Sequence, residues 1–265
     1  MQIAGYVASL LIGLTLGLIG GGGSILTMPV LVYFFGTSPV LATCYSLFVV
    51  GTTSMAGSVS YYKKGFANLR IAALFGISSI ITVYLTRKFI VHSLPAVLFS
   101  INGFQVTESL FTMVLFAILI VLASLSMIRS KNADEDSTGP KKQLHFFQLF
   151  VSGIIIGLVT GLLGAGGGFL LIPALVLLIG LPMKEAVGTS LVIITLNSLI
   201  GFISDLGHFN IQWNMLIGIT AIAVCGMYIG IHFSKKVDSA WLKKAFGWFV
   251  LAMGIYIIIK ELFIH

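Results

Sequence analysis

Long apolar runs, separated by short polar segments, make up most of the chain. A transmembrane helix needs about 20 mostly apolar residues, which several of these runs supply. An open sheet in lipid would leave its edge amide groups unpaired, so the runs are predicted to be helices. The ten predicted helices are Ile3 to Ile19, Ser24 to Phe35, Val40 to Tyr62, Ile71 to Thr86, Thr107 to Ile128, Phe146 to Leu163, Phe169 to Ile179, Met183 to Ser204, Trp213 to Ser234 and Trp241 to Phe263.

The composition indicates that these helices lie in a membrane. Of the 265 residues, 58% are hydrophobic and 9% are charged, and the mean hydropathy is +1.09. A soluble domain averages about 25% charged residues. The net charge of +7 comes from short Lys and Arg clusters between apolar runs, a pattern typical of charge retained in the cytoplasm rather than of nucleic-acid binding. We expect a multi-pass protein of the plasma (inner) membrane, with lipid and a small solute as its partners.

Few residues offer catalytic or metal-binding chemistry. The five His residues lack metal-ligand spacing, and the scarce acidic residues form no catalytic triad or carboxylate pair. Cys44 and Cys225 fall inside apolar runs, where we expect two small buried side chains. The sequence therefore predicts a protein that is not an enzyme and that uses no metal or cofactor.

The chain divides into two similar halves. Residues 129–145, which include SKNADEDSTGPKKQ, form a predicted linker between repeats at residues 1–128 and 146–265. A shift of about 144 residues aligns GLIGGGGSILTMPVLVYFFG with GLLGAGGGFLLIPALVLLIG, and further along it aligns Ser46 with Ser190 and Ser54 with Ser198. Such internal duplication is typical of transporter folds.

The motifs of both halves resemble the TauE/SafE sulfite exporter family over nearly the whole chain. Each half has a glycine-broken apolar run, then a short apolar segment with Pro, then a run that starts with small and hydroxyl residues. The second half matches well through LLGAGGGFLLIPAL and AVGTSL, whereas the first half has ATCYSL where Gly-Thr-Ser is expected. The resemblance implies transport, without ATP, of small sulfur-containing anions such as sulfite or a sulfonate.

The glycine breaks allow two topologies. Ser24 to Phe35 would be a helix of about 18 Å, little more than half of a hydrocarbon core of about 30 Å. Each broken run is therefore one kinked span or a hairpin that enters and leaves on one face. Kinked spans divide Lys and Arg about 8 to 7 between the two faces, whereas hairpins divide them about 12 to 3. The imbalance favours hairpins.

The predicted fold is an all-α, polytopic membrane protein of two inverted repeats. Each repeat has a glycine-broken helix hairpin and three transmembrane helices, with both termini outside and the linker in the cytoplasm. The apolar segment Phe89 to Val106 contains Pro95 and Gly103 and has no counterpart in the second half, so it is assigned to no element.

The glycine breaks are the predicted site. Broken helices of inverted repeats meet near the midplane, and each helix start offers N–H groups and about half a positive charge. No predicted span carries Lys or Arg in its middle, so helix ends are expected to be the only fixed positive potential there, which favours an anion. Close helix packing is the alternative explanation of the glycines. The break residues predicted to bind solute are Gly21, Gly22, Gly23, Ser24, Ala165, Gly166, Gly167 and Gly168.

Polar side chains of the following helices complete the predicted site. Thr43, Ser46, Thr189 and Ser190 could donate hydroxyls, although Ser and Thr in helices commonly bond their own backbone carbonyls. Asn197 is the most costly of these residues to bury unpaired and so carries the most weight. The ionisable residues near helix ends are expected to be hydrated rather than to carry protons; they are Glu108, Glu185, Asp205 and His208.

Four classes of function compete. A carrier of sulfur-containing anions leads, and an uncoupled anion channel or a carrier for another small solute is the alternative; saturable uptake with counterflow separates a carrier from a channel. A membrane-embedded enzyme usually has an intramembrane cluster of His, Asp or Glu. A scaffold would not need two equivalent broken helices.

Overall fold

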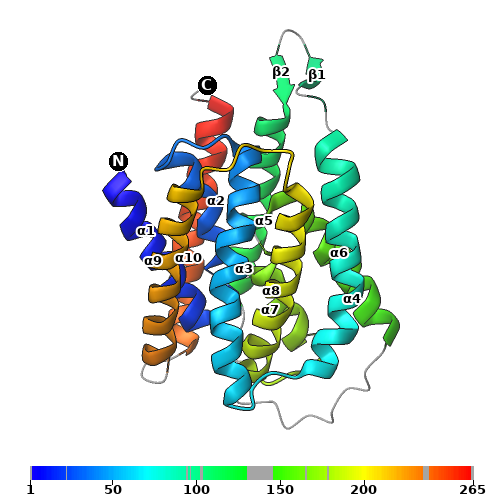
Figure 1. Ribbon diagram of the computed structural model, residues 1–265, viewed down its shortest axis with the longest axis vertical. Coiled ribbons are helices and arrows are strands. Elements are labelled where there is room, and N and C mark those ends of the chain that lie inside the picture. Colours follow the sequence, from blue (N-terminus) through cyan, green and yellow to red (C-terminus); the bar gives the residue numbers. More distant parts are fainter. Residues whose placement is uncertain are drawn as a thin grey trace.

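The computed structural model describes residues 2–21, 23–93, 95, 97–101, 104–129, 146–164, 166–177, 179–234 and 239–263. Within these ranges the chain forms ten α-helices and one small β-hairpin (Figure 1). The elements of the first half are α1 (Gln2–Ile19), α2 (Ser24–Tyr33), α3 (Pro39–Lys63), α4 (Leu69–Leu85), the π-helical turn η1 (Thr86–Ile90), the 3-10 turn η2 (Val91–Ser93), β1 (Val97–Ile101), β2 (Phe104–Thr107) and α5 (Glu108–Arg129). Those of the second half are α6 (Phe146–Leu163), α7 (Gly168–Leu177), α8 (Met183–Asp205), α9 (Trp213–Phe233) and α10 (Ser239–Phe263).

The helices lie roughly along one common direction, and the chain runs through the two halves in opposite senses. In Figure 1, α1 descends from the upper end and α2 returns towards it, after which α3, α4 and α5 run down, up and down. In the second half α6 rises from the lower end and α7 returns to it, and α8, α9 and α10 run up, down and up. The start of α1 and the end of α10 therefore lie at the same end of the bundle.

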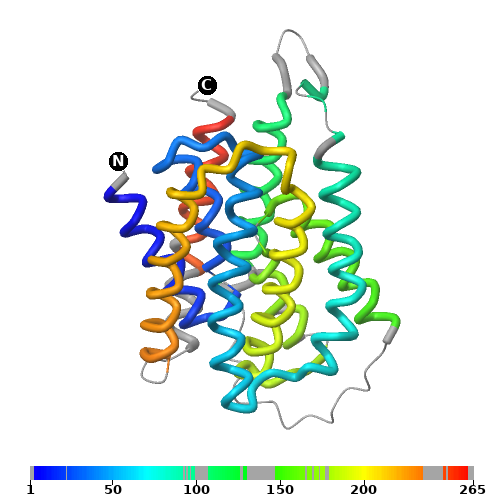
Figure 2. Tube along the Cα trace, in the orientation of Figure 1, coloured from blue at the N-terminus to red at the C-terminus, as the bar shows by residue number. Residues whose placement is uncertain are grey.

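The two halves interlock by exchanging partners. Helix α1 packs along α9 of the other half, and its counterpart α6 packs along α4 (Figure 2). Helices α3 and α8 pack against each other, as do α5 and α10. The α1–α9 contact of one half is thus matched by the α6–α4 contact of the other. Both halves therefore contribute helices to the same core.

Short helices α2 and α7 end in the same way. After each of them a glycine takes a left-handed conformation, with φ of 67° at Gly36 and 75° at Gly180. The next N–H then reaches back six residues, from Thr37 to the Leu31 carbonyl and from Leu181 to the Leu175 carbonyl, at 3.2 Å in both cases. A left-handed glycine is a common way to end a helix, and the repetition of these bonds shows that the duplication extends to backbone geometry.

The bundle has the surface expected of a membrane protein. Five helical segments are long and apolar enough to cross a bilayer: Pro39–Lys63, Leu69–Ile90, Glu108–Leu125, Met183–Asp205 and Trp213–Phe233. Large apolar side chains such as Ile77, Phe147 and Ile217 are exposed on the outer surface, where lipid replaces water. Cys44 is buried as expected, but Cys225 is exposed on α9, so the expectation that both thiols are buried is wrong for Cys225.

The segment that the sequence left unassigned continues α4 and then forms the β-hairpin. The helix extends through η1 and η2, and β1 then pairs with β2 in an antiparallel arrangement. The sequence predicted neither the extension of this helix nor the hairpin. The hairpin lies beyond the end of α4, outside the helical bundle (Figure 1).

Candidate solute-binding site

The two glycine breaks have the same local geometry. Helix α1 ends where the Gly20 N–H donates to the Leu16 carbonyl at 2.8 Å, and α6 ends where the Gly164 N–H donates to the Thr160 carbonyl at 2.9 Å. Both glycines have positive φ, 88° and 64°, a conformation that costs other residues about 1–2 kcal/mol. Glycine is therefore what allows the chain to leave the helix and turn back at both places.

The breaks of the two halves touch inside the bundle. A Cβ atom added at Gly21 would overlap the Gly168 backbone, and one added at Gly168 would overlap Gly21. Gly20 also packs on Val187 of α8, and Gly164 packs on Thr43 of α3. Each break thus lies against the other break and against a long helix of the opposite half.

Every other predicted glycine that the structure describes is also closely packed. Gly23 faces Thr15 and Ile12 of its own hairpin, Gly166 faces Val50, and Gly167 faces Thr160. Close packing, the alternative left open by the sequence, therefore accounts for the absence of side chains at these positions in this conformation. Gly22 and Ala165 lie outside the described residues.

The predicted hydroxyl donors do not all converge. Ser24 donates to the Gly21 carbonyl at 2.8 Å, Thr43 to the Val40 carbonyl at 2.7 Å and Ser190 to the Val187 carbonyl at 2.8 Å. Thr189 instead accepts the Asn68 N–H at 3.0 Å and so anchors the α3–α4 connection. Thr43 is in the first turns of α3 and Thr189 in those of α8, which begin at opposite ends of the bundle (Figure 1).

A second set of polar groups lies in the interior. Asn197 donates its Nδ2 to the Ser79 hydroxyl at 2.5 Å, and its Oδ1 has no partner among the described residues. Six hydroxyls are likewise buried at 0% exposure without a partner in the described parts of the chain: Thr27, Ser46, Thr53, Ser54, Thr160 and Ser198. Of these, only Ser46 was predicted. The internal repeat, which aligns Ser54 with Ser198, was the signal that could have found the pair.

Charge also occurs inside the bundle, contrary to expectation. Arg87 of η1 and Asp205 at the end of α8 form an ion pair, with 3.2 Å between Nη1 and Oδ2, and both side chains are 0% exposed. The expectation that Asp205 is hydrated is therefore wrong. Arg87 adds a buried positive charge in the last turn of the segment Leu69–Ile90, rather than in the middle of a span. Position within an apolar run does not reveal which end residues pack against another helix, and this is why both charges were assigned to the surface.

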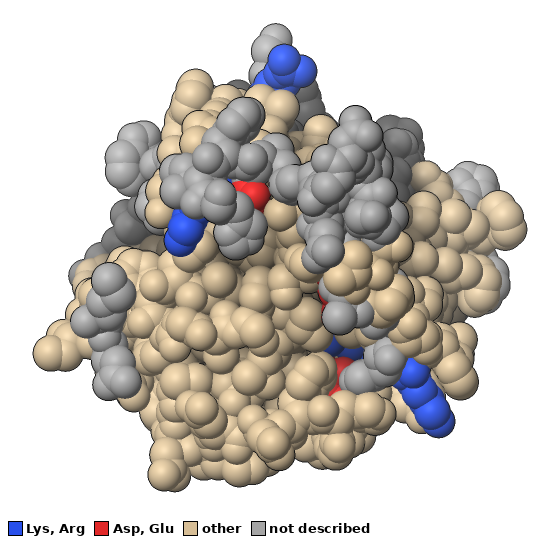
Figure 3. Space-filling model, turned by 90° about the horizontal axis from the view of Figure 1, so that it is seen from above, with Lys and Arg blue, Asp and Glu red and all other residues tan. Residues whose placement is uncertain are grey.

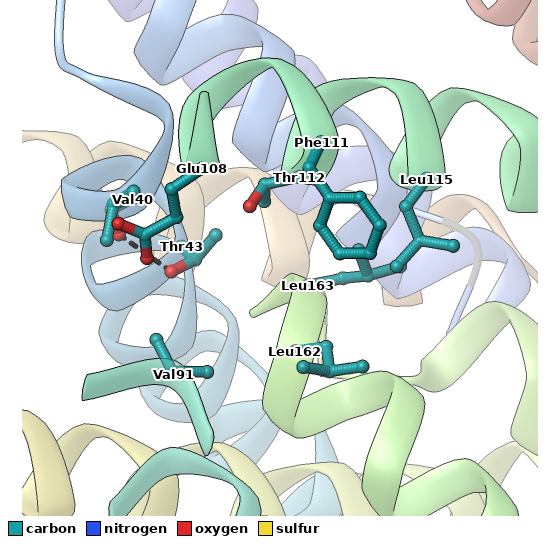
Figure 4. A pocket seen from close by; sticks show the side chains of 9 residues that line it. All are labelled: Val40, Thr43, Val91, Glu108, Phe111, Thr112, Leu115, Leu162 and Leu163. Atoms are coloured by element: carbon teal, nitrogen blue, oxygen red, sulfur yellow. Dashed lines mark hydrogen bonds between the residues drawn. The ribbon is translucent and has the colours of Figure 1, made fainter. Parts of the chain in front are cut away.

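A small pocket is lined in part by Val91, which follows Arg87 by one turn. Its walls come from the starts of α3 and α5, from η2 and from the end of α6, and Figure 4 shows Glu108 pointing its carboxylate towards the Thr43 hydroxyl. Glu108 is partly buried rather than fully hydrated, whereas His208 is exposed. The residues that line the pocket are Val40, Thr43, Val91, Glu108, Phe111, Thr112, Leu115, Leu162 and Leu163.

The pocket connects two features of the site. Thr43 both lines it and packs against Gly164, and Leu163 precedes that glycine in the chain. The pocket therefore extends from the acidic start of α5 to the second glycine break. Within the described residues no group of three His, Cys, Asp or Glu side chains is arranged to hold a metal ion.

Comparison with known proteins gives a consistent result. The family model described as "Sulfite exporter TauE/SafE" matches residues 6–257. The chain is 29% identical over 257 residues to a "Probable membrane transporter protein" of Xylella fastidiosa (strain Temecula1 / ATCC 700964), covering 94% of this chain and 91% of the relative. It is 25% identical over 283 residues to "Probable membrane transporter protein YunE" of Bacillus subtilis (strain 168), covering 97% of both chains. No solved structure matches significantly.

Proposed function

Because this chain belongs to the sulfite exporter TauE/SafE family, whose described relatives are membrane transporters, we propose that it is a secondary transporter of small sulfur-containing anions. Sulfite or a sulfonate is the expected class of substrate. The anion would bind where the two glycine breaks meet, near the middle of the bilayer. The meeting of Gly21 with Gly168 is the observation that carries this proposal.

The arrangement of the helices supports a pair of inverted repeats around that site. The α1–α2 hairpin opens towards one end of the bundle and the α6–α7 hairpin towards the other (Figure 1). Each half adds three long helices, and the contacts of one half are matched by those of the other. In transporters of this kind the broken helices hold the substrate, and one repeat moves against the other to expose it alternately to each side.

The chemistry around the breaks suits a small anion. Helices α2 and α7 start at the breaks, and each helix start carries about half a positive charge that is not neutralised by a side chain. Buried hydroxyls such as those of Ser54 and Ser198, which lack partners among the described residues, could donate hydrogen bonds to oxyanion oxygens. A buried polar group without a partner costs free energy, and a bound oxyanion would remove that cost.

The conformation described here is closed at the breaks. Since the backbones of Gly21 and Gly168 touch, no solute fits between them. Transport would therefore require the two hairpins to separate by the size of the anion, and rebinding of one break on the other would close the path after release. Alternating access in a carrier includes such a closed state.

Purified protein in detergent and in liposomes provides the test. Sulfite, thiosulfate, methanesulfonate and sulfate should raise its melting temperature, and the anion that does so should show saturable uptake and counterflow in liposomes. Methanesulfonamide, a neutral analogue, should bind weakly because it lacks the charge that helix starts attract. Equal binding of the amide, or no response to any of the anions, would remove the proposal, and uptake without saturation or counterflow would favour a channel.

A further inference from the structure

The buried ion pair joins the two halves at one end of the bundle. Arg87 belongs to the first half and Asp205 to the second, with 3.2 Å between their charged atoms and no exposed side-chain surface. Both lie in the last turn of long membrane-spanning segments, Leu69–Ile90 and Met183–Asp205. Removing two charges from water costs several kcal/mol per ion, so such a pair is poor evidence for a purely stabilising role.

The internal repeat shows that this fold does not require charge at these positions. A shift of 144 residues places Ile231 where Arg87 stands, and Tyr61 where Asp205 stands. Both are buried, at 7% and 8% exposure. The equivalent place at the other end of the bundle is thus built from uncharged side chains, and the charges at 87 and 205 need an explanation other than packing.

The pair also lies beside the route from its end of the bundle to the glycine breaks. The Cys44 side chain lies beside Asp205, and its neighbour Thr43 lines the pocket and touches Gly164. Val91, one turn after Arg87, lines the same pocket. Figure 3, which views the molecule from this end, shows acidic and basic atoms recessed close together below the surface.

We propose that Arg87 binds the transported anion as it passes between this end of the bundle and the glycine breaks, and that Asp205, released from Arg87, takes up a proton. The inference rests on the proposed function, because it names the coupling of the same transport. With the ion pair closed the site has one positive and one negative charge; with a monoanion on the Arg87 guanidinium and a proton on the Asp205 carboxylate, the sum is unchanged. An unprotonated Asp205 would otherwise be a buried charge without its partner, which costs several kcal/mol in general. Proton binding and anion binding are therefore coupled.

Few other titratable groups surround the pair. The described parts of the chain place Cys44 of α3 against it, Glu108 of α5 across the neighbouring pocket, Lys88 exposed beside Arg87, and His208 exposed three residues after Asp205. Helix α6, which packs on η1, has no titratable residue. Among the described residues, Glu108 is the one rival proton acceptor with a carboxylate near the anion's path, and the experiment must separate it from Asp205.

Calorimetric titration of the full-length protein with methanesulfonate, whose charge is constant from about pH 5.5 to about pH 8, measures both events. Two buffers with different heats of ionisation give the number of protons taken up per anion, expected to be about one for the unchanged protein. Asp205→Asn should abolish the proton uptake and make affinity independent of pH, since its amide needs no proton when Arg87 turns to the anion. Glu108→Gln should leave proton uptake in place.

The role of Arg87 is tested with a double variant in which both charged side chains of the pair are replaced by neutral ones. Arg87→Gln combined with Asp205→Asn leaves no unpaired buried charge, so the variant should fold, with a melting temperature near that of the unchanged protein. Its affinity should fall by about 30-fold or more, as for loss of a buried charge contact. Lys88→Gln, a change of the exposed neighbouring cation, should bind normally.

Each failure has a distinct meaning. If the unchanged protein binds none of the sulfur anions, the proposed function falls and this inference falls with it. Three other results would leave the proposed function in place and show that the coupling by Arg87 and Asp205 is wrong, provided that the unchanged protein binds methanesulfonate. The double variant could bind methanesulfonate as well as the unchanged protein does. Alternatively, proton uptake could persist in Asp205→Asn or disappear in Glu108→Gln.

Discussion

Glycines at the two helix breaks allow the backbones of the two halves to approach closely. Gly21 and Gly168 lie where the two halves touch, and no side chain fits at either position. The sequence indicated a helix break at both glycines, but it could not decide between packing and solute binding, because both need a missing Cβ. Packing and solute binding are compatible if they occur in different conformations. The backbones that touch when the site is closed would line the site when the two hairpins separate.

Adding a methyl group at the contact should affect both stability and transport. We expect Gly21→Ala or Gly168→Ala to cost about 1–3 kcal/mol of unfolding free energy, because the new Cβ forces the backbones apart, and to lower the uptake rate. Gly76→Ala on α4 is the control, since its nearest neighbour atom would be 3.9 Å away and alanine favours a helix. Thermal melts and liposome uptake measure the two effects; a normal melt for both break variants would contradict the closed contact.

Removing an unpartnered hydroxyl should separate binding from folding. Ser54→Ala and Ser198→Ala delete buried hydroxyls that have no partner in the described residues, so stability should change by no more than about 1 kcal/mol. Anion affinity should nevertheless fall severalfold if these hydroxyls donate to the solute. Ser204→Ala is a suitable control, because the Ser204 hydroxyl already donates to the Gly201 carbonyl at 2.7 Å. Unchanged affinity in both variants would remove the hydroxyls from the site.

At the scale of elements, the sequence predicted most of the helices but did not predict which helices pack together. The predicted helix Val40 to Tyr62 corresponds to α3 (Pro39–Lys63), and Met183 to Ser204 corresponds to α8 (Met183–Asp205). These predictions were close because a long apolar run that crosses a membrane forms a helix. The extension of α4 through η1, and with it the burial of Arg87, could not be predicted from local pattern. That burial depends on Asp205, 118 residues later in the chain.

Helix pairing across the halves depends on glycines that face the partner backbone. A Cβ at Gly226 of α9 would overlap the Leu10 carbonyl of α1, and one at Gly157 of α6 would lie 2.6 Å from the Ser79 carbonyl of α4. We expect Gly226→Ala and Gly157→Ala each to lower the melting temperature in detergent, because overpacking at the new Cβ costs about 1–3 kcal/mol of unfolding free energy. Gly218→Ala, on the same helix as Gly226 but 3.6 Å from its nearest neighbour atom, should melt normally. Matching losses for the two halves would support the exchange of partners.

For the whole molecule, the duplication was readable from the sequence because the glycine and proline spacing repeats. The sequence could not reveal that α1 packs on α9 or α6 on α4, since these contacts join residues about 200 and about 80 positions apart, beyond any local pattern. The candidate site was predicted only in part for the same reason. Its glycines are adjacent in the chain, whereas its ion pair and hydroxyls come together only in the folded bundle.

The side of the membrane on which each end lies stays a prediction, and labelling can test it. In the bundle the α3–α4 connection at Lys64 and the turn at Lys88 lie at opposite ends (Figure 1), and both side chains are exposed. The distribution of Lys and Arg, about 12 to 3 for hairpin topology, assigns the Lys64 end to the cytoplasm. In a variant without Cys44 and Cys225, an impermeant thiol reagent added to intact cells should therefore label Lys88→Cys and leave Lys64→Cys unlabelled until the cells are opened. The reverse result would invert the orientation while keeping the fold, and equal labelling of both would mean that the two positions share one face, which is incompatible with three full spans and a hairpin in each half.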